Sequence, residues 1–246
     1  MKILLLGSTG MAGSMIKKYL NFNMDCPTRN EFNPLTMDIP NLNKYDYVIN
    51  CIGQIKKKQC DEEIFYKINS EFPIKLANKN NKVIHISSDC VFSGNLSQDK
   101  SYSSEDIPDA TDIYGMSKIK GESPALMVLR TSIIGPSKDN FGLFEWFKNS
   151  SNVNGFNNHL WSGITTLELA KIINDVIINN KYEHKLLQIA SDKICKYDLL
   201  CEINNVFNMN KIITEVEDDI SINRSLISQI KVKPIRKQLI ELKEFI

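Results

Sequence analysis

The sequence predicts an α/β fold built on a doubly wound parallel sheet, with a small lobe appended toward its C-terminal end. In the first half, short β-like runs alternate with helical patterns, which is typical of a parallel sheet covered by helices on both faces. Beyond Gly135-Pro136 this order changes. The 246 residues, 42% of them hydrophobic, are enough to bury one core with a small lobe beside it.

Apolar runs predict the strands of the first half. They lie at Lys2–Leu6, Tyr47–Cys51, Val83–Ser87 and Ala125–Arg130, with a weaker second strand at Met24–Thr28. Helix-compatible patterns lie between them at Met11–Leu20 and Glu62–Asn80. Pro73 should start or kink the second of these helices because it has no backbone N–H. Residues Ser93–Asp112, rich in Ser, Asp and Gly, predict a long surface loop.

The second half is expected to supply the lobe. Helices are predicted at Phe141–Asn149, Thr166–Asn179 and Lys196–Phe207, and short strands near Leu186–Ala190 and Ile212–Val216. No repeat or low-complexity linker marks a clean domain boundary.

Composition argues for a small partner. Thirty basic and 29 acidic residues leave a net charge of +1, without the broad positive field that binds nucleic acid or an anionic membrane. No apolar stretch approaches the ~18 residues of a membrane span. The six cysteines show no CxxC pair, and the three histidines lack metal-site spacing. We therefore expect no metal, reduced thiols and a cytoplasmic protein.

The opening segment predicts a nucleotide-binding turn. A strand leads into GxxGxxG at Gly7–Gly13, followed by a helix. Such glycines permit a tight turn and let backbone N–H groups approach a pyrophosphate at the positive end of the helix. The expected contacts come from Gly7, Thr9, Gly10, Met11 and Ala12. The alternative is a glycine-rich turn that serves only close packing.

The segment after the second strand favours NADP over NAD. Arg29 stands where NAD-binding folds place an acidic residue for the ribose hydroxyls, and a basic residue there accommodates a 2′-phosphate. The alternative is a solvated surface arginine. Asp38 and Ile39 are expected to flank the adenine, and Cys51, Ile52 and Gly53 to end the third strand beside the ribose.

A phenol and an ammonium lie one helical turn apart in Tyr114-Gly-Met-Ser-Lys118. A nearby cation stabilises phenolate, so we expect Lys118 to lower the pKa of Tyr114 and make it a usable proton donor. Lys118 can also hold the nicotinamide ribose. Ser87-Ser88-Asp89 ends a predicted strand at the carboxyl edge of the sheet, where a hydroxyl can donate to a developing oxyanion.

Together, GSTGMAG, ISSDCVFSG (86–94), YGMSKIKGE (114–122) and LRTSIIGP (129–136) resemble the extended short-chain dehydrogenases/reductases. More narrowly they are similar to the dTDP-4-dehydrorhamnose reductases, and TTLELAKII (165–173) and CKYDLLCEI (195–203) extend the likeness. The resemblance implies a Rossmann-type NADP-binding domain at residues 1–135. Residues 136–246 would mainly form a substrate-binding lobe, with some elements returning to the sheet.

The resemblance also implies a reaction. The family's Ser/Thr-Tyr-Lys set falls on Ser88, Tyr114 and Lys118. Hydride would pass from NADPH to the C4 ketone of a nucleotide-activated 4-keto-6-deoxyhexose. Tyr114 would protonate the alkoxide, Ser88 would polarise the carbonyl, and Lys118 would tune the tyrosine.

One residue departs from the pattern. Cys90 stands where the rhamnose-forming enzymes usually carry tyrosine, and the related GDP-fucose synthases have an acid/base cysteine there. A C4 ketone acidifies the C3 proton, so the resemblance implies a bifunctional C3 epimerase and C4 reductase as one hypothesis. The alternative is a small apolar filler. No histidine is in register as the second acid/base; His159 is the nearest in sequence.

Substrate contacts are expected from Ser88, Asp89, Cys90, Trp146 and Arg224. Trp146 and Trp161 are each candidates for stacking on a nucleobase or for packing in the lobe, with packing favoured. Arg224 resembles the position where relatives aim an arginine at the nucleotide's diphosphate, and a structural arginine is an equal alternative.

Two rival functions remain open. One is a non-catalytic regulatory subunit, like the β subunit of methionine adenosyltransferase, which the intact Ser88, Tyr114 and Lys118 disfavour. The other is a redox-neutral epimerase that recycles its nicotinamide. The nucleotide base, the substituent at C2 and the oligomeric state also stay open, with a homodimer as one alternative.

Overall fold

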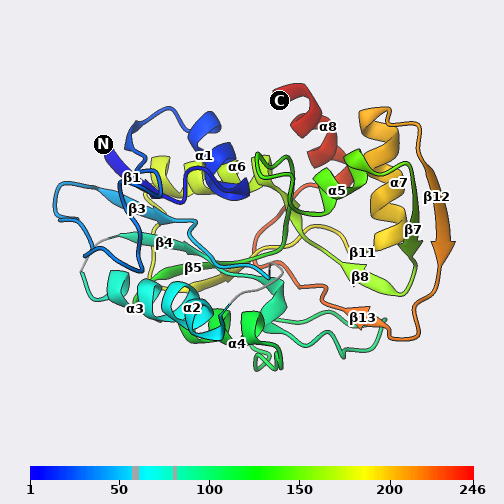
Figure 1. The fold of residues 1–246 in the computed structure, drawn as a ribbon, viewed down its shortest axis with the longest axis horizontal. Helices are drawn as coiled ribbons and strands as arrows, with labels where there is room; N and C mark the ends of the chain where they lie inside the picture. Colours follow the sequence, from blue (N-terminus) through cyan, green and yellow to red (C-terminus); the bar gives the residue numbers. More distant parts are fainter. Residues whose placement is uncertain (57–60, 80–81) are drawn as a thin grey trace.

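A six-stranded parallel sheet forms the centre of the molecule (Figure 1). The structure is a computed structural model that describes residues 1–56, 61–79 and 82–246. All neighbouring strands pair in parallel, in the order β10-β5-β4-β3-β1-β2. Their bounds are β1 Lys2–Leu6, β2 Asn23–Asp25, β3 Tyr47–Asn50, β4 Val83–Ile86, β5 Met127–Arg130 and β10 Leu186–Gln188. The predicted doubly wound sheet is confirmed.

Alternating side chains of the sheet bury two separate apolar layers. Ile3 and Leu5 of β1 belong to the core that contains α1 (Met11–Tyr19) and α6 (Thr166–Ile178). Leu4 and Leu6 face the other core, with Phe72 and Leu76. Helices α2 (Glu62–Tyr66), α3 (Phe72–Ala77) and α4 (Ile113–Gly121) cover this second face (Figure 1). The strands are apolar on both faces because both are covered.

The helix expected over residues 62–80 is divided into three segments. Between α2 and α3, residues Lys67–Glu71 form a π-helical segment. Pro73 has no N–H to donate to the carbonyl of Asn69 four residues earlier, so a regular α-helix cannot continue through it. The end expected at Asn80 lies outside the described residues, as does Cys60.

Much of the second half forms a lobe at one end of the sheet (Figure 1). Helix α6 and strand β10, which were expected in the lobe, instead belong to the central unit, where α6 packs beside α1 and β10 is the edge strand of the sheet. Helices α5 (Leu143–Asn149), α7 (Lys196–Phe207) and α8 (Ile235–Phe245) share an apolar core with Trp161. Strands β11 (Ile194–Cys195), β8 (His159–Trp161) and β13 (Ile222–Asn223) form a small sheet. Two-stranded pairs join β12 (Ile212–Val216) to β7 (Asn152–Phe156), and β6 (Ile133–Ile134) to β9 (Ile164–Thr165).

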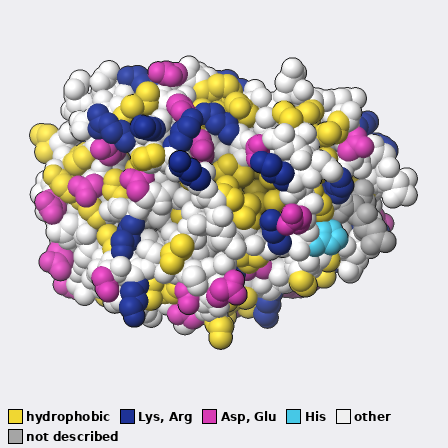
Figure 2. Space-filling model, turned by 180° about the vertical axis from the view of Figure 1, so that it is seen from behind, with side chains coloured by type: hydrophobic (Ala, Val, Ile, Leu, Met, Phe, Trp, Pro, Cys, Tyr) yellow, Lys and Arg dark blue, Asp and Glu magenta, His cyan; other side chains and the backbone are white. Residues whose placement is uncertain are grey.

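Acidic and basic side chains are interspersed over the face seen in Figure 2, and neither sign gathers into a single patch there. None of the helices in the described ranges combines the length and apolar character needed to cross a membrane. The five cysteines within those ranges are free thiols.

Candidate functional site

The chain turns sharply between β1 and α1. Gly7 has φ +77°, and a Cβ there would lie 2.8 Å from the backbone of Cys51. A Cβ on Gly13 would lie 2.1 Å from the carbonyl oxygen of Gly7, so both glycines are required by the fold. Gly10 differs, because its Cβ would meet nothing closer than 3.5 Å. Gly10 is the N-cap residue of α1 and provides no side-chain cap, so it leaves room for a ligand to approach the backbone.

The segment after β3 lies against this turn. The N–H of Cys51 donates to the carbonyl of Leu6 (3.0 Å), and the N–H of Ile52 donates to the Asn50 side chain (3.1 Å). The carboxyl ends of β1 and β3 are therefore adjacent, as the expected ribose site requires. Thr9 is exposed on the turn, and Met11 and Ala12 begin α1.

The turn after β2 presents Arg29 to solvent. Glu31 holds this turn by accepting hydrogen bonds from the N–H and hydroxyl of Thr28 (2.7 and 2.8 Å). Arg29 has no ion pair within the described ranges. Asp25, the acidic residue at the end of β2, is already engaged by the Tyr45 hydroxyl (2.6 Å) and the Lys2 ammonium (3.0 Å). A free cation and an occupied carboxylate fit a 2′-phosphorylated dinucleotide better than one without that phosphate.

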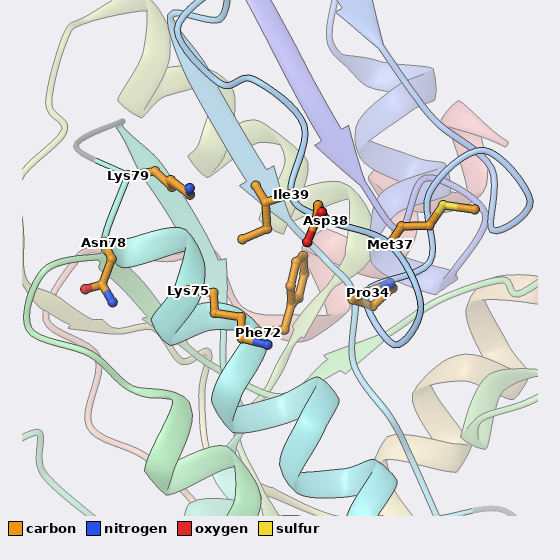
Figure 3. Close-up of a pocket in the computed structure, with 8 residues that line it drawn as sticks. All are labelled: Pro34, Met37, Asp38, Ile39, Phe72, Lys75, Asn78 and Lys79. Atoms are coloured by element: carbon orange, nitrogen blue, oxygen red, sulfur yellow. The ribbon is translucent and has the colours of Figure 1, made fainter.

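Asp38 and Ile39 lie in the connection between β2 and β3, where they line a pocket of about 400 Å³. Phe72 and Lys75 of α3 line the opposite side, and Asn78 and Lys79 follow them (Figure 3). The placement of Asp38 and Ile39 beside an adenine stays a prediction, with an open pocket next to both residues.

Ser88 stands just beyond the end of β4. It caps the short 3₁₀ turn Asp89–Val91, its hydroxyl oxygen accepting from the N–H of Cys90 (3.1 Å). The same hydroxyl donates to Asp89 Oδ1 (3.2 Å). Ser88 is therefore held at the carboxyl edge of the parallel sheet, the edge from which the turn after β1 also leaves.

A close helix contact brings Tyr114 to this edge. Asp112 caps α4 by accepting from the N–H of Gly115 (3.0 Å). A Cβ on Gly115 would lie 2.3 Å from the carbonyl oxygen of Cys90 and 2.4 Å from Ala110 Cβ, so only glycine permits this packing. One turn later the Lys118 ammonium donates to the carbonyl of Ile86 (2.7 Å), with 4% of the residue exposed.

Burial dominates the acid–base properties of these groups. It raises the pKa of Tyr114, and the neighbouring Cys90 and Asp89 add to the rise, whereas a hydrogen bond with Ser88 opposes it. Burial lowers the pKa of Lys118 to about 8, against the opposing influence of Glu122 and Cys51. The expected lowering of the Tyr114 pKa by Lys118 is not found in this structure. The lysine ammonium is directed to the Ile86 carbonyl, and desolvation of the phenol prevails.

Cys90 lies beside the same groups. Burial raises the pKa of its thiol to about 12, helped by the charge of Asp89. The thiol contacts Asp89 Oδ1 at 3.6 Å. At neutral pH it is protonated, and so it could serve as an acid before it served as a base.

The two tryptophans occupy different environments. Trp146 is 47% exposed on α5, whereas Trp161 is 5% exposed and lies under the Lys196 ammonium, 4.9 Å from the ring centre. Arg224 donates to the carbonyls of Phe92 and Ser93 (3.0 Å each), which is the structural role left open for it. Substrate contacts of Trp146 and Arg224 stay predictions.

Two buried supports of the site were not foreseen. Asn69 exchanges hydrogen bonds with the backbone of Gln54 and donates to Ser117 Oγ (3.0 Å), which ties the π-helical segment to α4. Glu122 pairs with Arg130 (2.6 Å) and accepts from the Ser87 hydroxyl (2.6 Å). The signal for this pair in the sequence was two charged residues near the two ends of one apolar strand, Glu122 in KGE and Arg130 in LRTS.

Comparisons with known proteins agree with this geometry. The family model described as RmlD substrate binding domain matches residues 1–244. No curated protein matches the sequence. A dTDP-4-dehydrorhamnose reductase from Clostridium acetobutylicum is 20% identical, with TM-score 0.82 over 99% of both chains. One from Bacillus anthracis, in complex with NADP, is 16% identical, with TM-score 0.83 over 99% of this chain and 98% of the other. One from Yersinia enterocolitica is 22% identical, with TM-score 0.77 over 99% of both chains. At these identities the likeness establishes the fold.

Proposed function

Because the chain belongs to the RmlD substrate binding domain family, we propose that it is an NADP(H)-dependent reductase of a nucleotide-activated keto sugar. The observation that carries the proposal is the convergence of Ser88, Tyr114 and Lys118 beyond the carboxyl end of β4, on the same edge of the sheet as the glycine turn after β1. The Bacillus anthracis structure holds NADP on the same fold, which supports the cofactor.

The residues present fit this cofactor. The Gly10 backbone and the N-terminus of α1 would receive the pyrophosphate, Arg29 the 2′-phosphate, and Lys118 the nicotinamide ribose. When bound, NADPH supplies the hydride that reduces a ketone. The hydride adds to the carbonyl carbon, and the carbonyl oxygen then needs one proton.

Two side chains of the protein stabilise and protonate that oxygen. Ser88, whose oxygen accepts from the N–H of Cys90, would turn its one hydroxyl hydrogen from Asp89 to the carbonyl oxygen and so stabilise the developing charge. Tyr114 donates the proton to the alkoxide. Its raised pKa keeps the phenol protonated before reaction, and the positive charges of Lys118 and the oxidised nicotinamide would stabilise the phenolate that remains.

The substrate class of the proposal is a 4-keto-6-deoxyhexose linked to UDP or dTDP, of the rhamnose type or its 2-acetamido analogue. The expected test is consumption of NADPH with these four substrates, comparing the wild type with Tyr114→Phe. Turnover should depend on the sugar and fall by a factor of roughly 100 to 10,000 in the variant, which loses its proton donor. NADP binding should persist, and equal turnover in the variant would refute the role of Tyr114.

The same experiment separates the rival functions. If NADP binds but none of the four sugars is reduced, a redox-neutral epimerase or a regulatory subunit is favoured. Exchange of a sugar proton with solvent then distinguishes the epimerase. Residues 1–135 as the cofactor domain, cytoplasmic location and homodimer formation stay part of the proposal, and light scattering of the purified protein would measure the assembly.

A second activity, C3 epimerisation, is supported by the position of Cys90 beside Ser88 and Tyr114. A base on one face of the sugar would accept the C3 proton, and the Cys90 thiol would deliver its own proton to the opposite face and regain one from solvent, which inverts the carbon without net oxidation. We expect Cys90→Ser to abolish deuterium uptake from solvent into the keto sugar while reduction continues. Cys201→Ser, on α7, is the matched control. Unchanged uptake in Cys90→Ser would reject the epimerase.

A further inference from the structure

A fully buried histidine lies within the parallel sheet. His85 of β4 pairs in register with Asn50 of the neighbouring strand β3, and neither residue has any exposed surface (Figure 1). The amide nitrogen of Asn50 lies 3.1 Å from Nδ1 of His85. Apart from this pair, the two strands consist of Tyr, Val and Ile. Two polar side chains thus meet at positions where apolar residues would be expected.

The backbone beside Asn50 fixes the direction of this hydrogen bond. The N–H of Ile52 can only donate, and it donates to Asn50 Oδ1 (3.1 Å). The amide group is therefore oriented with its NH₂ toward His85, so Nδ1 of the imidazole must accept. A neutral imidazole that accepts at Nδ1 carries its proton on Nε2.

This arrangement leaves an unsatisfied donor in the core. Nε2 of His85 is buried and has no hydrogen-bond partner among the residues that the structure describes. A buried N–H without a partner destabilises a fold, whereas an apolar side chain in its place would not. Burial and the nearby charge of Lys118 also hold the pKa of His85 well below its ordinary value, so the ring is neutral near pH 7. Stability gives no reason for a histidine here, and we look for the reason in its hydrogen bond with Asn50.

The oriented amide holds a turn that lies against the nucleotide-binding glycines. Asn50 Oδ1 accepts from the N–H of Ile52 two residues later, which closes a local turn after β3. The backbone nitrogen of Ile52 would lie 2.9 Å from a Cβ placed on Gly7. The turn after β3 and the glycine turn after β1 are thus in close backbone contact. A shift of Ile52 would therefore reach the segment where the pyrophosphate is expected.

The far end of the same turn has a separate anchor. Asn69 accepts from the N–H of Gln54 (2.8 Å) and donates to its carbonyl (2.9 Å), one residue after Gly53. This second anchor does not involve His85. Replacing the histidine should therefore loosen the turn at Ile52 and leave it attached at Gln54.

We propose that His85 is a positioning residue for the cofactor, because its acceptor nitrogen fixes the amide orientation with which Asn50 holds Ile52. The inference rests on the proposed function, since it assigns the turn at residues 51–53 to NADP. Without an acceptor at the place of Nδ1, the Asn50 amide is free to rotate, and the N–H of Ile52 loses its fixed partner. His85 acts through Asn50 and has no need to touch the cofactor.

The test compares two replacements of His85. His85→Asn places an amide oxygen where Nδ1 stands and so keeps an acceptor, whereas His85→Leu fills the site without one. We expect the Kd for NADP, measured by titration calorimetry, to rise roughly 10-fold in His85→Leu and by no more than about threefold in His85→Asn. His184→Leu, at an exposed position, is the control and should bind as the wild type does. A purely structural role predicts the opposite order, because asparagine leaves a cavity and buries another amide group, whereas leucine does neither.

Two local measurements test the mechanism itself. Hydrogen exchange at the Ile52 amide should be roughly 10-fold faster in His85→Leu than in the wild type, and close to the wild-type rate in His85→Asn. In the wild type, the ¹⁵N shifts of the His85 ring should identify the tautomer with its proton on Nε2. A proton on Nδ1 would overturn the proposal without the use of any variant.

The outcomes separate this proposal from the proposed function. If the wild type binds NADP and His85→Leu binds it within about twofold as tightly, the positioning role is overturned and the reductase proposal stands. Equal losses in His85→Leu and His85→Asn overturn it as well. If the expected order of affinities is found but none of the keto sugars is reduced, the positioning role stands and the reductase proposal fails. If the wild type binds no NADP, both proposals are wrong.

Discussion

Replacing Gly115 by alanine should disable the site without touching any side chain that reacts. The new Cβ would lie 2.3 Å from the Cys90 carbonyl oxygen and 2.4 Å from Ala110 Cβ, against the ~3.4 Å or more of an ordinary contact. Helix α4 must therefore move by about 1 Å, carrying Tyr114 away from Ser88. Overpacking of this kind costs ~1–3 kcal/mol, which lowers the unfolding midpoint by roughly 2–12 °C in a chain of this size.

A displacement of about 1 Å at a catalytic group reduces turnover roughly 100-fold. The assay is NADPH consumption by Gly115→Ala well below its unfolding temperature, together with calorimetric unfolding. Gly10→Ala is the matched control, because its Cβ would meet nothing nearer than 3.5 Å. It should leave the unfolding midpoint unchanged and raise KM for NADPH. Wild-type turnover in Gly115→Ala would refute the argument that this glycine sets the position of Tyr114.

Three further outcomes are expected. Arg29→Ala should raise KM for NADPH roughly 10-fold to 100-fold and leave KM for NADH unchanged, since only NADPH carries the 2′-phosphate; equal effects on both would contradict that assignment. Glu122→Gln should destabilise the protein by ~3–5 kcal/mol in chemical unfolding, because it leaves Arg130 buried without its anion, whereas Glu202→Gln, in the exposed pair with Arg236, should cost ~1 kcal/mol or less. Above pH 8 the folded state binds fewer protons than the unfolded state, because the pKa of Lys118 is lowered to about 8. Wild-type stability should therefore rise with pH relative to Lys118→Met up to about pH 10, by at most ~1.4 kcal/mol per pH unit, and parallel curves would contradict the shift.

The central sheet was predictable because its strands are buried on both faces. Lys2–Leu6 is almost wholly apolar and is followed at once by glycines, so the end of the apolar run and the start of the glycine turn mark the same end of the strand. Helices α6 and α7 were equally clear, since Thr165 and Cys195 cap them and buried residues recur at helical spacing. Helix α8 was missed, although Pro234 precedes it, because its charged residues conceal the few that are buried.

The short strands of the lobe were beyond sequence reasoning for a different reason. Strands β11 and β13 have two residues each, too few for any periodicity, and they exist only because both pair with β8. Their register joins positions 35 and 63 residues apart in the chain, as in Cys195 with Leu160 and Asn223 with Leu160. No local propensity encodes such pairings, which tertiary context decides.

The same distinction separates the parts of the site that were predicted from those that were not. Ser88 comes soon after strand β4, and Tyr114 and Lys118 lie in helix α4. Their placement therefore depends on local structure and on the edge shared by the carboxyl ends of parallel strands. The interaction of Lys196 with Asp89 depends on how the lobe packs against the sheet, and no local sequence pattern links these two distant residues. Catalytic residues at the edge of the sheet can thus be predicted from the sequence, whereas contacts made by the lobe become apparent only in the structure. Substrate specificity should therefore be sought first among the lobe residues that face Asp89 and Cys90.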